Sequence, residues 1–235
     1  MLFPLAQSDD GPRKHRVPVP DLIASVLSGE RLGREQACTL MELPVRACDK
    51  LFAAAAELRR RGKGTIVTYS PKVFLPITNL CRNRCSYCTF RRDPDDPDAR
   101  TMTRDQIRER LRQGRALGCT EALLCLGDKP ERVHSGYAGE LAALGCESTL
   151  DYVRGACEIA LTEGLLPHTN MGVLTGREMA LLRPVNASLG LMLESVSARL
   201  RAKGMPHHLA PDKEPVDRLR MIEEAGELAI PFTTG

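Results

Sequence analysis

The sequence contains no tryptophan, and aromatic residues make up only 4% of its 235 residues, so its core is expected to be aliphatic. No apolar run approaches the roughly 20 residues that a membrane-spanning helix needs, which argues against a membrane protein. Residues 1–6 lack the basic and long apolar stretches of a signal peptide. We therefore expect a cytoplasmic location.

An excess of charge of one sign is also missing, because 33 Lys and Arg face 30 Asp and Glu, a net charge of +3. Nucleic-acid-binding proteins usually concentrate basic residues on one surface, so we expect no nucleic-acid partner. Cysteine, in contrast, is plentiful, with nine residues. An odd number of cysteines without secretory features favours metal ligands and buried thiols in a reducing compartment over disulfides.

The first 63 residues predict a tail followed by a small helical extension. Residues 1–19 are rich in Pro, Arg and Asp without a sustained period, which indicates a flexible tail. Residues 20–63 carry apolar residues at helical spacing, and the longest predicted helix covers 44–61.

From residue 64 onward, short apolar runs alternate with amphipathic segments. This order predicts β-α units, hence an α/β fold with a parallel sheet or barrel. The five strand candidates are residues 73–78, 121–126, 165–169, 185–194 and 228–234. Polar residues cluster where these runs end, and in parallel barrels the chemistry lies at that edge.

Cys81, Cys85 and Cys88 form a C-x3-C-x2-C motif directly after the first predicted strand. A structural zinc site or three unrelated thiols are the alternatives, but zinc usually takes four ligands and no second pair of cysteines or histidines accompanies the motif. Cubane [4Fe–4S] clusters are held by cysteine thiolates, usually four. Three thiolates therefore leave one iron open to a small molecule.

The segment 78–92, which reads TNLCRNRCSYCTFRR, resembles the radical S-adenosylmethionine (SAM) superfamily. Within that superfamily it resembles the 7,8-didemethyl-8-hydroxy-5-deazariboflavin synthases, which make the deazaflavin core of coenzyme F420. Further segments that resemble these synthases are residues 69–74, 121–131, 165–170, 184–194 and 230–235.

This resemblance implies a partial (β/α) TIM-like barrel over residues 64–235. Radical SAM barrels of this type have six strands, whereas the sequence offers five candidates. We therefore expect a barrel that is incomplete in this chain and lacks its C-terminal part.

The resemblance also implies the chemistry. A [4Fe–4S] cluster, reduced by a donor such as ferredoxin or flavodoxin, cleaves SAM to a 5′-deoxyadenosyl radical. The radical abstracts hydrogen from a small-molecule substrate, an adduct of a tyrosine-derived hydroxybenzyl group and a ribitylamino-uracil. Cyclisation with loss of ammonia makes the enzyme a carbon–nitrogen lyase. A second radical SAM protein supplies the adduct.

Four residues are candidates for cofactor binding under this resemblance. Tyr87 is expected near the SAM adenine, Gly127 and Asp128 near its amino group, and Glu194 near its ribose or methionine. Ordinary loop packing, a plain βα turn and a helix-capping acid are the alternatives for these positions.

The segment after the third predicted strand supplies the substrate-site candidates. His168 is expected to accept a proton during ring closure, because its ordinary pKa is near 6.5. Thr169 and Asn170 are expected to bind substrate carbonyls or the ribityl chain, with a structural turn as the alternative. We predict a loop rather than a metal site at residues 207–208, because no third ligand is near in sequence.

Deazaflavin synthesis is thus the favoured function. Two alternatives are related radical SAM enzymes: the partner that joins tyrosine to the uracil, and a menaquinone-pathway or biotin-synthase-like enzyme. An alternative of another class is a non-catalytic metal-binding or interaction module.

Overall fold

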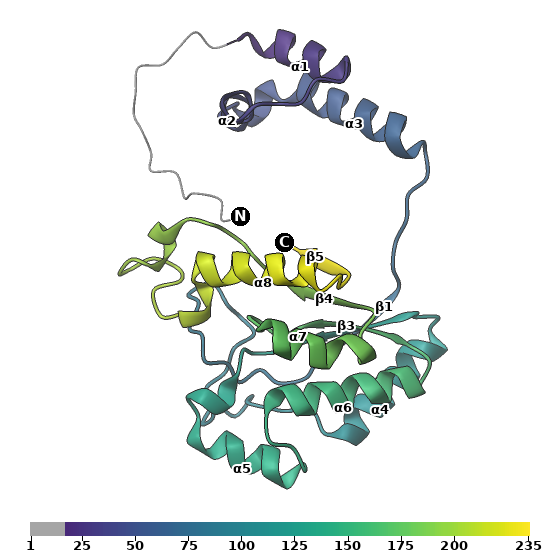
Figure 1. Cartoon of the computed structure of the whole chain (residues 1–235), viewed down its shortest axis with the longest axis vertical. Coiled ribbons are helices and arrows are strands. Elements are labelled where there is room, and N and C mark those ends of the chain that lie inside the picture. The colour runs from purple at the N-terminus through teal and green to yellow at the C-terminus, as the bar shows by residue number, and fades with distance from the viewer. Residues whose placement is uncertain (1–16) are drawn as a thin grey trace. The chain divides into compact units, whose positions relative to one another are not determined.

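The computed structural model describes residues 17–235, which form two compact units, one ending at Thr68 and one beginning at Tyr69 (Figure 1). Residues 1–16, most of the predicted tail, lie outside the described residues.

The N-terminal unit consists of helices α1 (Val19–Leu27), α2 (Arg34–Met41) and α3 (Asp49–Lys63). α1 packs against both other helices, and Leu22 of α1 is buried. The predicted continuous helix over 44–61 is wrong at its start. Pro44 is extended, and a short 3-10 turn precedes α3.

The core unit is built on a five-stranded parallel sheet, which confirms the predicted α/β fold. Its strands are β1 (Lys72–Pro76), β2 (Glu121–Cys125), β3 (Leu166–Asn170), β4 (Ser188–Leu191) and β5 (Phe232–Thr234). The spatial order is β1-β2-β3-β4-β5, and every neighbouring pair is parallel. Strands that follow one another both in sequence and in space, linked by helices, are the arrangement of a (β/α) barrel.

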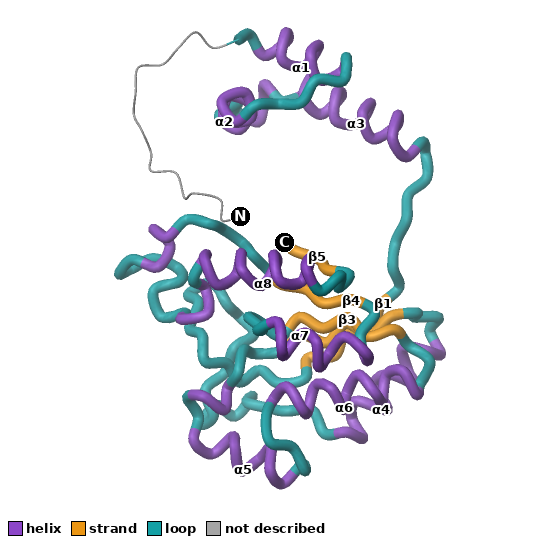
Figure 2. Tube along the Cα trace, in the orientation of Figure 1, coloured by secondary structure: helices purple, strands orange, loops and turns teal. Residues whose placement is uncertain are grey.

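Helices cover one side of this sheet (Figure 2). The helices of the core unit are α4 (Arg104–Ala116), α5 (Ser135–Ala143), α6 (Thr149–Thr162), α7 (Gly176–Leu182) and α8 (Pro215–Glu227), of which α5 packs on the 3-10 turn Pro130–Arg132. α4 packs on β1, α6 on β3 and α8 on β5. The helix starts follow from capping, because the side chains of Thr103, Ser148 and Thr175 accept a hydrogen bond from the N–H three residues later.

The two faces of the sheet differ, because successive side chains of a strand point to opposite sides. On the helix-covered face, Leu75 and Leu124 are fully buried. A Cβ at Gly114 of α4 would lie 2.5 Å from Cβ of Val73, so the glycine allows close helix–sheet packing. On the other side, called the open face here, Phe74 remains 48% exposed.

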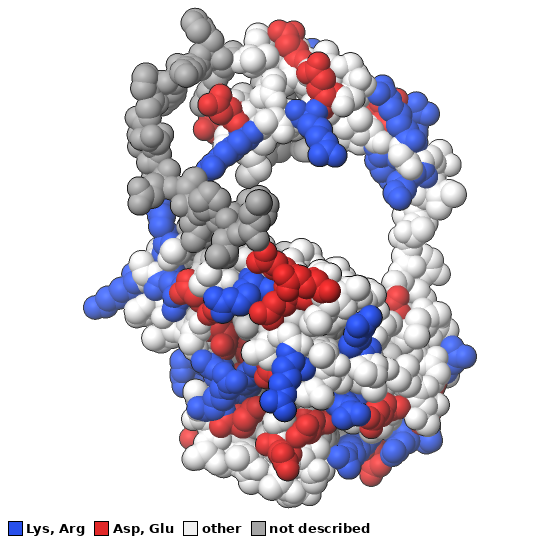
Figure 3. Space-filling model, in the orientation of Figure 1, with Lys and Arg blue, Asp and Glu red and all other residues white. Residues whose placement is uncertain are grey.

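Charges on the core unit are mixed rather than segregated on the face visible in Figure 3, where Lys and Arg alternate with Asp and Glu. Ion pairs between neighbouring helices or turns contribute to this mixing, such as Arg112 with Glu163 at 3.2 Å. Among residues 17–235, no helix is both long and apolar enough to cross a membrane.

Candidate active site

The cysteine loop is the segment 77–103 between β1 and α4, and hydrogen bonds within it give it a defined shape. Asn79 is 3% exposed. Its Oδ1 accepts from the N–H of Arg100 at 2.8 Å, and its Nδ2 donates to the carbonyl of Asp98 at 2.8 Å. One buried amide thus closes the loop on itself. The three cysteines thereby lie beyond the carboxyl end of β1.

Backbone N–H groups donate to the sulfurs of Cys81 and Cys88. Cys81 and Cys85 are partly buried, and Cys88 is exposed. Sγ of Cys81 accepts from the N–H of Asp128 at 3.1 Å and from that of Asn83 at 3.4 Å. Sγ of Cys88 accepts from the N–H of Arg91 at 3.4 Å. Burial raises the pKa of the Cys81 thiol, and these N–H groups oppose that rise. Hydrogen bonds to cysteine sulfurs help to set the reduction potential of iron–sulfur clusters. The N–H donors found here therefore fit such a cluster.

The two kinds of metal centre considered for the cysteine motif differ in how far apart their ligands stand. Within residues 17–235, no three His, Cys, Asp or Glu side chains converge closely enough to hold a single metal ion. A zinc ion draws its thiolates to about 2.3 Å, whereas each thiolate of a cubane binds a different iron, so its sulfurs stand farther apart.

Gly127, two residues beyond the end of β2, allows the cysteine loop to lie against the sheet edge. Its N–H donates to the carbonyl of Thr78 at 2.9 Å. A Cβ at this position would lie 1.8 Å from the carbonyl oxygen of Leu80 and 2.7 Å from Cβ of Cys81. Only glycine permits this approach. The SAM contact predicted at Gly127 stays a prediction, with a packing role beside it.

Asp128 is a buried carboxyl beneath the cysteine loop, 5% exposed. Its Oδ2 accepts from Nδ2 of Asn83 and from the N–H of Val173, each at 3.4 Å. Among the described residues its Oδ1 has no hydrogen-bond partner. Burial and then the neighbouring Asp212 raise the pKa of Asp128 to about 7. The amino-group contact predicted for Asp128 remains a prediction, and the orphaned oxygen is compatible with it.

Glu194 and Tyr87 meet, although 107 residues separate them in the sequence. The Tyr87 hydroxyl donates to Oε2 of Glu194, and Nζ of Lys213 lies 2.7 Å from Oε1. Although burial opposes its charge, the hydrogen bonds from Lys213 and Tyr87 lower the pKa of Glu194. Glu194 also has a left-handed backbone, φ +62°. Such a conformation is costly for a residue with a side chain, and residues of this kind cluster at functional sites.

His207 also belongs to this group, although no feature of the sequence places it there. Its Nε2 lies 3.0 Å from the Tyr87 hydroxyl and 3.3 Å from Oε2 of Glu194. The His207 and Tyr87 rings pack edge to face with centroids 5.6 Å apart. His207 lies in a loop as predicted, but that loop reaches the predicted cofactor residues. No local pattern could have revealed a contact across 120 residues.

His168, Thr169 and Asn170 do not form one group, because neighbouring strand residues alternate between faces. Thr169 points to the helix-covered side, where its hydroxyl bonds Oδ1 of Asn186 at 2.6 Å. His168 lies in the middle of β3 rather than at its end, and its Nδ1 is 2.6 Å from the Ser188 hydroxyl. Asn170 is the last residue of β3 and shares the open face with His168.

Two features define the surroundings of the His168 ring. A Cβ at Gly190 would lie 2.8 Å from Nε2 of His168. The imidazole therefore packs against β4 at a residue that has no side chain. Burial, and then the nearby Lys72, lower the pKa of His168 and favour its neutral form.

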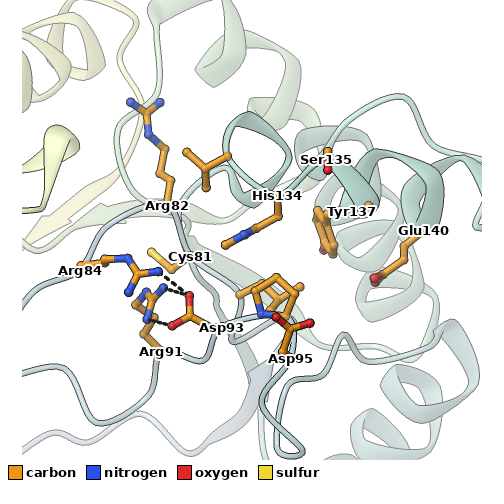
Figure 4. A pocket seen from close by; sticks show the side chains of 14 residues that line it. Cys81, Arg82, Arg84, Arg91, Asp93, Asp95, His134, Ser135, Tyr137 and Glu140 are labelled. Carbon is orange, nitrogen blue, oxygen red and sulfur yellow. Dashed lines mark hydrogen bonds and ion pairs between the residues drawn. The ribbon is translucent and has the colours of Figure 1, made fainter.

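A cavity of about 700 Å³ opens beside Cys81 (Figure 4). Its wall includes Arg84, Arg91 and Asp93. Arg84 donates to Oδ1 of Asp93 at 2.7 Å, and Arg91 donates to Oδ2 at 3.1 Å. His134 projects into it from the start of α5 (Figure 4). Residues of the cysteine loop thus form part of the cavity wall.

Two synthases are similar in sequence to this chain. A 7,8-didemethyl-8-hydroxy-5-deazariboflavin synthase from Methanococcoides burtonii is 49% identical over 169 residues, which are 72% of this chain and 49% of that protein. An FO synthase from Streptomyces coelicolor is 40% identical over 245 aligned positions, which cover 98% of this chain and 28% of that protein. The chain thus spans about half the length of the first synthase and less of the second.

Solved structures share the fold. The FeFe-hydrogenase maturase HydG from Carboxydothermus hydrogenoformans matches 92% of this chain and 47% of its own, with a TM-score of 0.73 and 22% identity. Methylornithine synthase matches 91% of this chain and 57% of its own, with a TM-score of 0.67 and 19% identity. The model of the Radical SAM superfamily matches residues 75–235, which include the whole cysteine loop and all strands from the end of β1. With its three-cysteine loop at the carboxyl edge of a parallel half-barrel, the chain belongs to the radical SAM superfamily.

Proposed function

We propose that this chain is the cluster- and SAM-binding part of an enzyme that forms 7,8-didemethyl-8-hydroxy-5-deazariboflavin. The observation that carries the proposal is the cysteine loop at the carboxyl edge of the sheet, in which the sulfurs of Cys81 and Cys88 accept hydrogen bonds from backbone N–H groups. The name of the relative that is 49% identical over 72% of this chain supports the product.

Cys81, Cys85 and Cys88 would hold a [4Fe–4S] cluster. When bound together with SAM, the reduced cluster supplies the electron that splits the sulfonium to methionine and a 5′-deoxyadenosyl radical. Glu194, whose pKa is lowered, stays charged and can accept hydrogen bonds from ribose hydroxyls. Oδ1 of Asp128 can accept from the SAM ammonium group.

The substrate, the adduct of hydroxybenzyl and ribitylamino-uracil, would lie over the open face. There the neutral imidazole of His168 can accept a proton at Nε2, while Ser188 holds its other nitrogen. Asn170 can donate to and accept from uracil carbonyls or ribityl hydroxyls. Because the hydroxyl of Thr169 is engaged on the other face, a contact between Thr169 and substrate has the least support of the three.

The proposal includes two partners and a compartment. A second radical SAM protein supplies the adduct, and a ferredoxin- or flavodoxin-like reductant supplies electrons. The cavity beside Cys81 offers a route from the surface towards the loop. The free cysteines are suited to a reducing compartment, which supports a cytoplasmic location. The related enzymes and the non-catalytic module considered above have no comparable support from the relatives found.

The test is anaerobic reconstitution with iron and sulfide, followed by reduction and addition of SAM. We expect iron–sulfur absorbance and 5′-deoxyadenosine, and a deazaflavin-fluorescent product once the adduct is added. The 235-residue chain and a version at the length of its relatives are compared. Cys85→Ala is expected to abolish cluster absorbance. A fully reduced cluster that yields no 5′-deoxyadenosine at either length would refute the proposal.

A further inference from the structure

The segment 206–213, called the strap here, runs along the cysteine loop on either side of Cys85. The N–H of Arg84 donates to the carbonyl of Leu209 at 2.8 Å, and the N–H of Ser86 donates to that of Pro206 at 3.0 Å. The backbone around the middle cysteine is therefore fixed by a segment that lies more than 100 residues later in the chain.

Side chains fasten the strap to the loop at both ends. At one end, the N–H of Asp212 donates to Oδ1 of Asn83 at 3.0 Å, and Oδ2 of Asp212 lies 3.1 Å from Nε of Arg82. At the other end, His207 bonds the Tyr87 hydroxyl at 3.0 Å. His207 is 5% exposed, and the Arg82–Asp212 pair is mostly buried, so water competes weakly for these contacts.

The strap itself is anchored to the rest of the core unit. Nη1 of Arg218, a buried arginine of α8, donates to the carbonyl of Asp212 at 2.9 Å. The N–H of His207 donates to the carbonyl of Leu200 at 2.8 Å. Lys213, the last residue of the strap, forms an ion pair with Glu194. The loop is thus tied to α8 and to the end of β4 through one short segment.

We propose that the strap positions the cysteine loop for its cluster, with His207 and Asp212 as the positioning residues. The inference rests on the proposed function in that the loop is taken to hold a cluster. Three thiolates on a free loop must be ordered before they can bind three irons together, and that ordering costs conformational entropy. A strap that orders them in advance reduces this cost, and its contact with Tyr87 and Glu194 extends the effect to SAM.

The first experiment uses matched variants of the reconstituted chain. His207→Phe keeps an aromatic ring but removes the hydrogen bond to Tyr87, His207→Gln restores a polar partner, and His208→Phe makes the same change at an exposed neighbour. We expect His207→Phe to lose iron to a chelator about tenfold faster and to bind SAM about tenfold more weakly, as fits the loss of a buried hydrogen bond. His207→Gln should recover most of both effects, and His208→Phe should match the unaltered chain.

The proposal is overturned if His207→Phe loses iron and binds SAM as the unaltered chain does. It is also overturned if His208→Phe changes both properties as much as His207→Phe does. A second readout does not depend on cluster loading: hydrogen exchange at the amides of Arg84 and Ser86, measured by mass spectrometry. Asp212→Ala should speed exchange in the peptide that carries them. Unchanged exchange overturns the strap, whereas an unaltered chain that takes up no iron refutes the proposed function instead.

Discussion

The helix-covered face and the open face of the sheet are made by the same five strands but serve different ends. Leu124, on the helix-covered face, is fully buried, whereas Leu166, on the open face, is 52% exposed. Covering one face with helices supplies the apolar burial that holds the unit together. The other face and its carboxyl edge are left to polar groups that no core packing requires.

Polar residues show the same division. On the helix-covered side, Thr169 is engaged by Asn186 and Cys157, as a structural hydroxyl is expected to be. On the open side, only one ring nitrogen of His168, Nδ1, has a hydrogen-bond partner among the described residues. Thr169 therefore has the contacts of a structural hydroxyl, whereas the proton-accepting role of His168 stays a prediction.

The largest expected effect is on cluster binding, from a substitution at the carboxyl edge of the sheet, which both faces share. Gly127→Ala places a Cβ 1.8 Å from the Leu80 carbonyl, so the cysteine loop must move away from β2. We expect iron content after reconstitution to fall at least about tenfold while circular dichroism remains that of the folded chain. Gly139→Ala in α5 has open space around the added methyl group and is the control. Full cluster loading in Gly127→Ala would show that the loop does not depend on this contact.

The next effect compares the two faces by one substitution. Leu124→Ala should lower the free energy of unfolding by about 3 kcal/mol, because it leaves a cavity in a packed core. Leu166→Ala should cost about 1 kcal/mol, because half of that side chain is already in water. Urea unfolding of the two variants measures the difference. Equal losses would mean that the open face is as closely packed as the covered one.

The smallest effect is the pH dependence that His168 contributes. Because its pKa is lowered in the folded chain, the unfolded chain binds more protons just below the ordinary value of 6.5. Its contribution to stability is therefore complete above 6.5 and declines as the pH falls through the folded pKa. Between about pH 7 and about pH 5.5, His168→Gln should lose less stability than the unaltered chain. His208→Gln is the control, and identical slopes in all three would place His168 in a solvated environment.

Much of the fold could be predicted because its signals are local. Capping residues such as Thr103 and Thr175 and short apolar runs stand in the sequence itself. Helix α5 was missed because it carries Gly136 and Gly139, and within it only Tyr137 and Leu141 are buried, too few for a clear period. The sequence predicts a fourth strand over 185–194, but β4 covers only Ser188–Leu191. A 3-10 turn at Arg183–Val185 precedes it, and the left-handed residue Glu194 lies beyond its end; neither has a clear signature in the sequence.

The candidate site was predictable only where one segment carries it. The three cysteines and Tyr87 lie within eight residues and resemble a known motif. His207, which contacts Tyr87, and Asp212, which contacts Asn83 and Arg82, come from a loop whose own composition indicates nothing beyond a turn. The packing role of Gly127 likewise depends on the loop that lies against it, which only the folded chain brings into place.

The span between Tyr87 and His207 also bears on how the protein is made. The cysteine loop leaves the ribosome 120 residues before the histidine that contacts it. Domains generally fold as units during or after synthesis, so the loop cannot take its final shape until the later segment has emerged. Delivery of iron and sulfide is therefore expected to follow translation of the strap, and a ribosome-stalled chain ending before residue 206 should leave its three thiols open to oxidation.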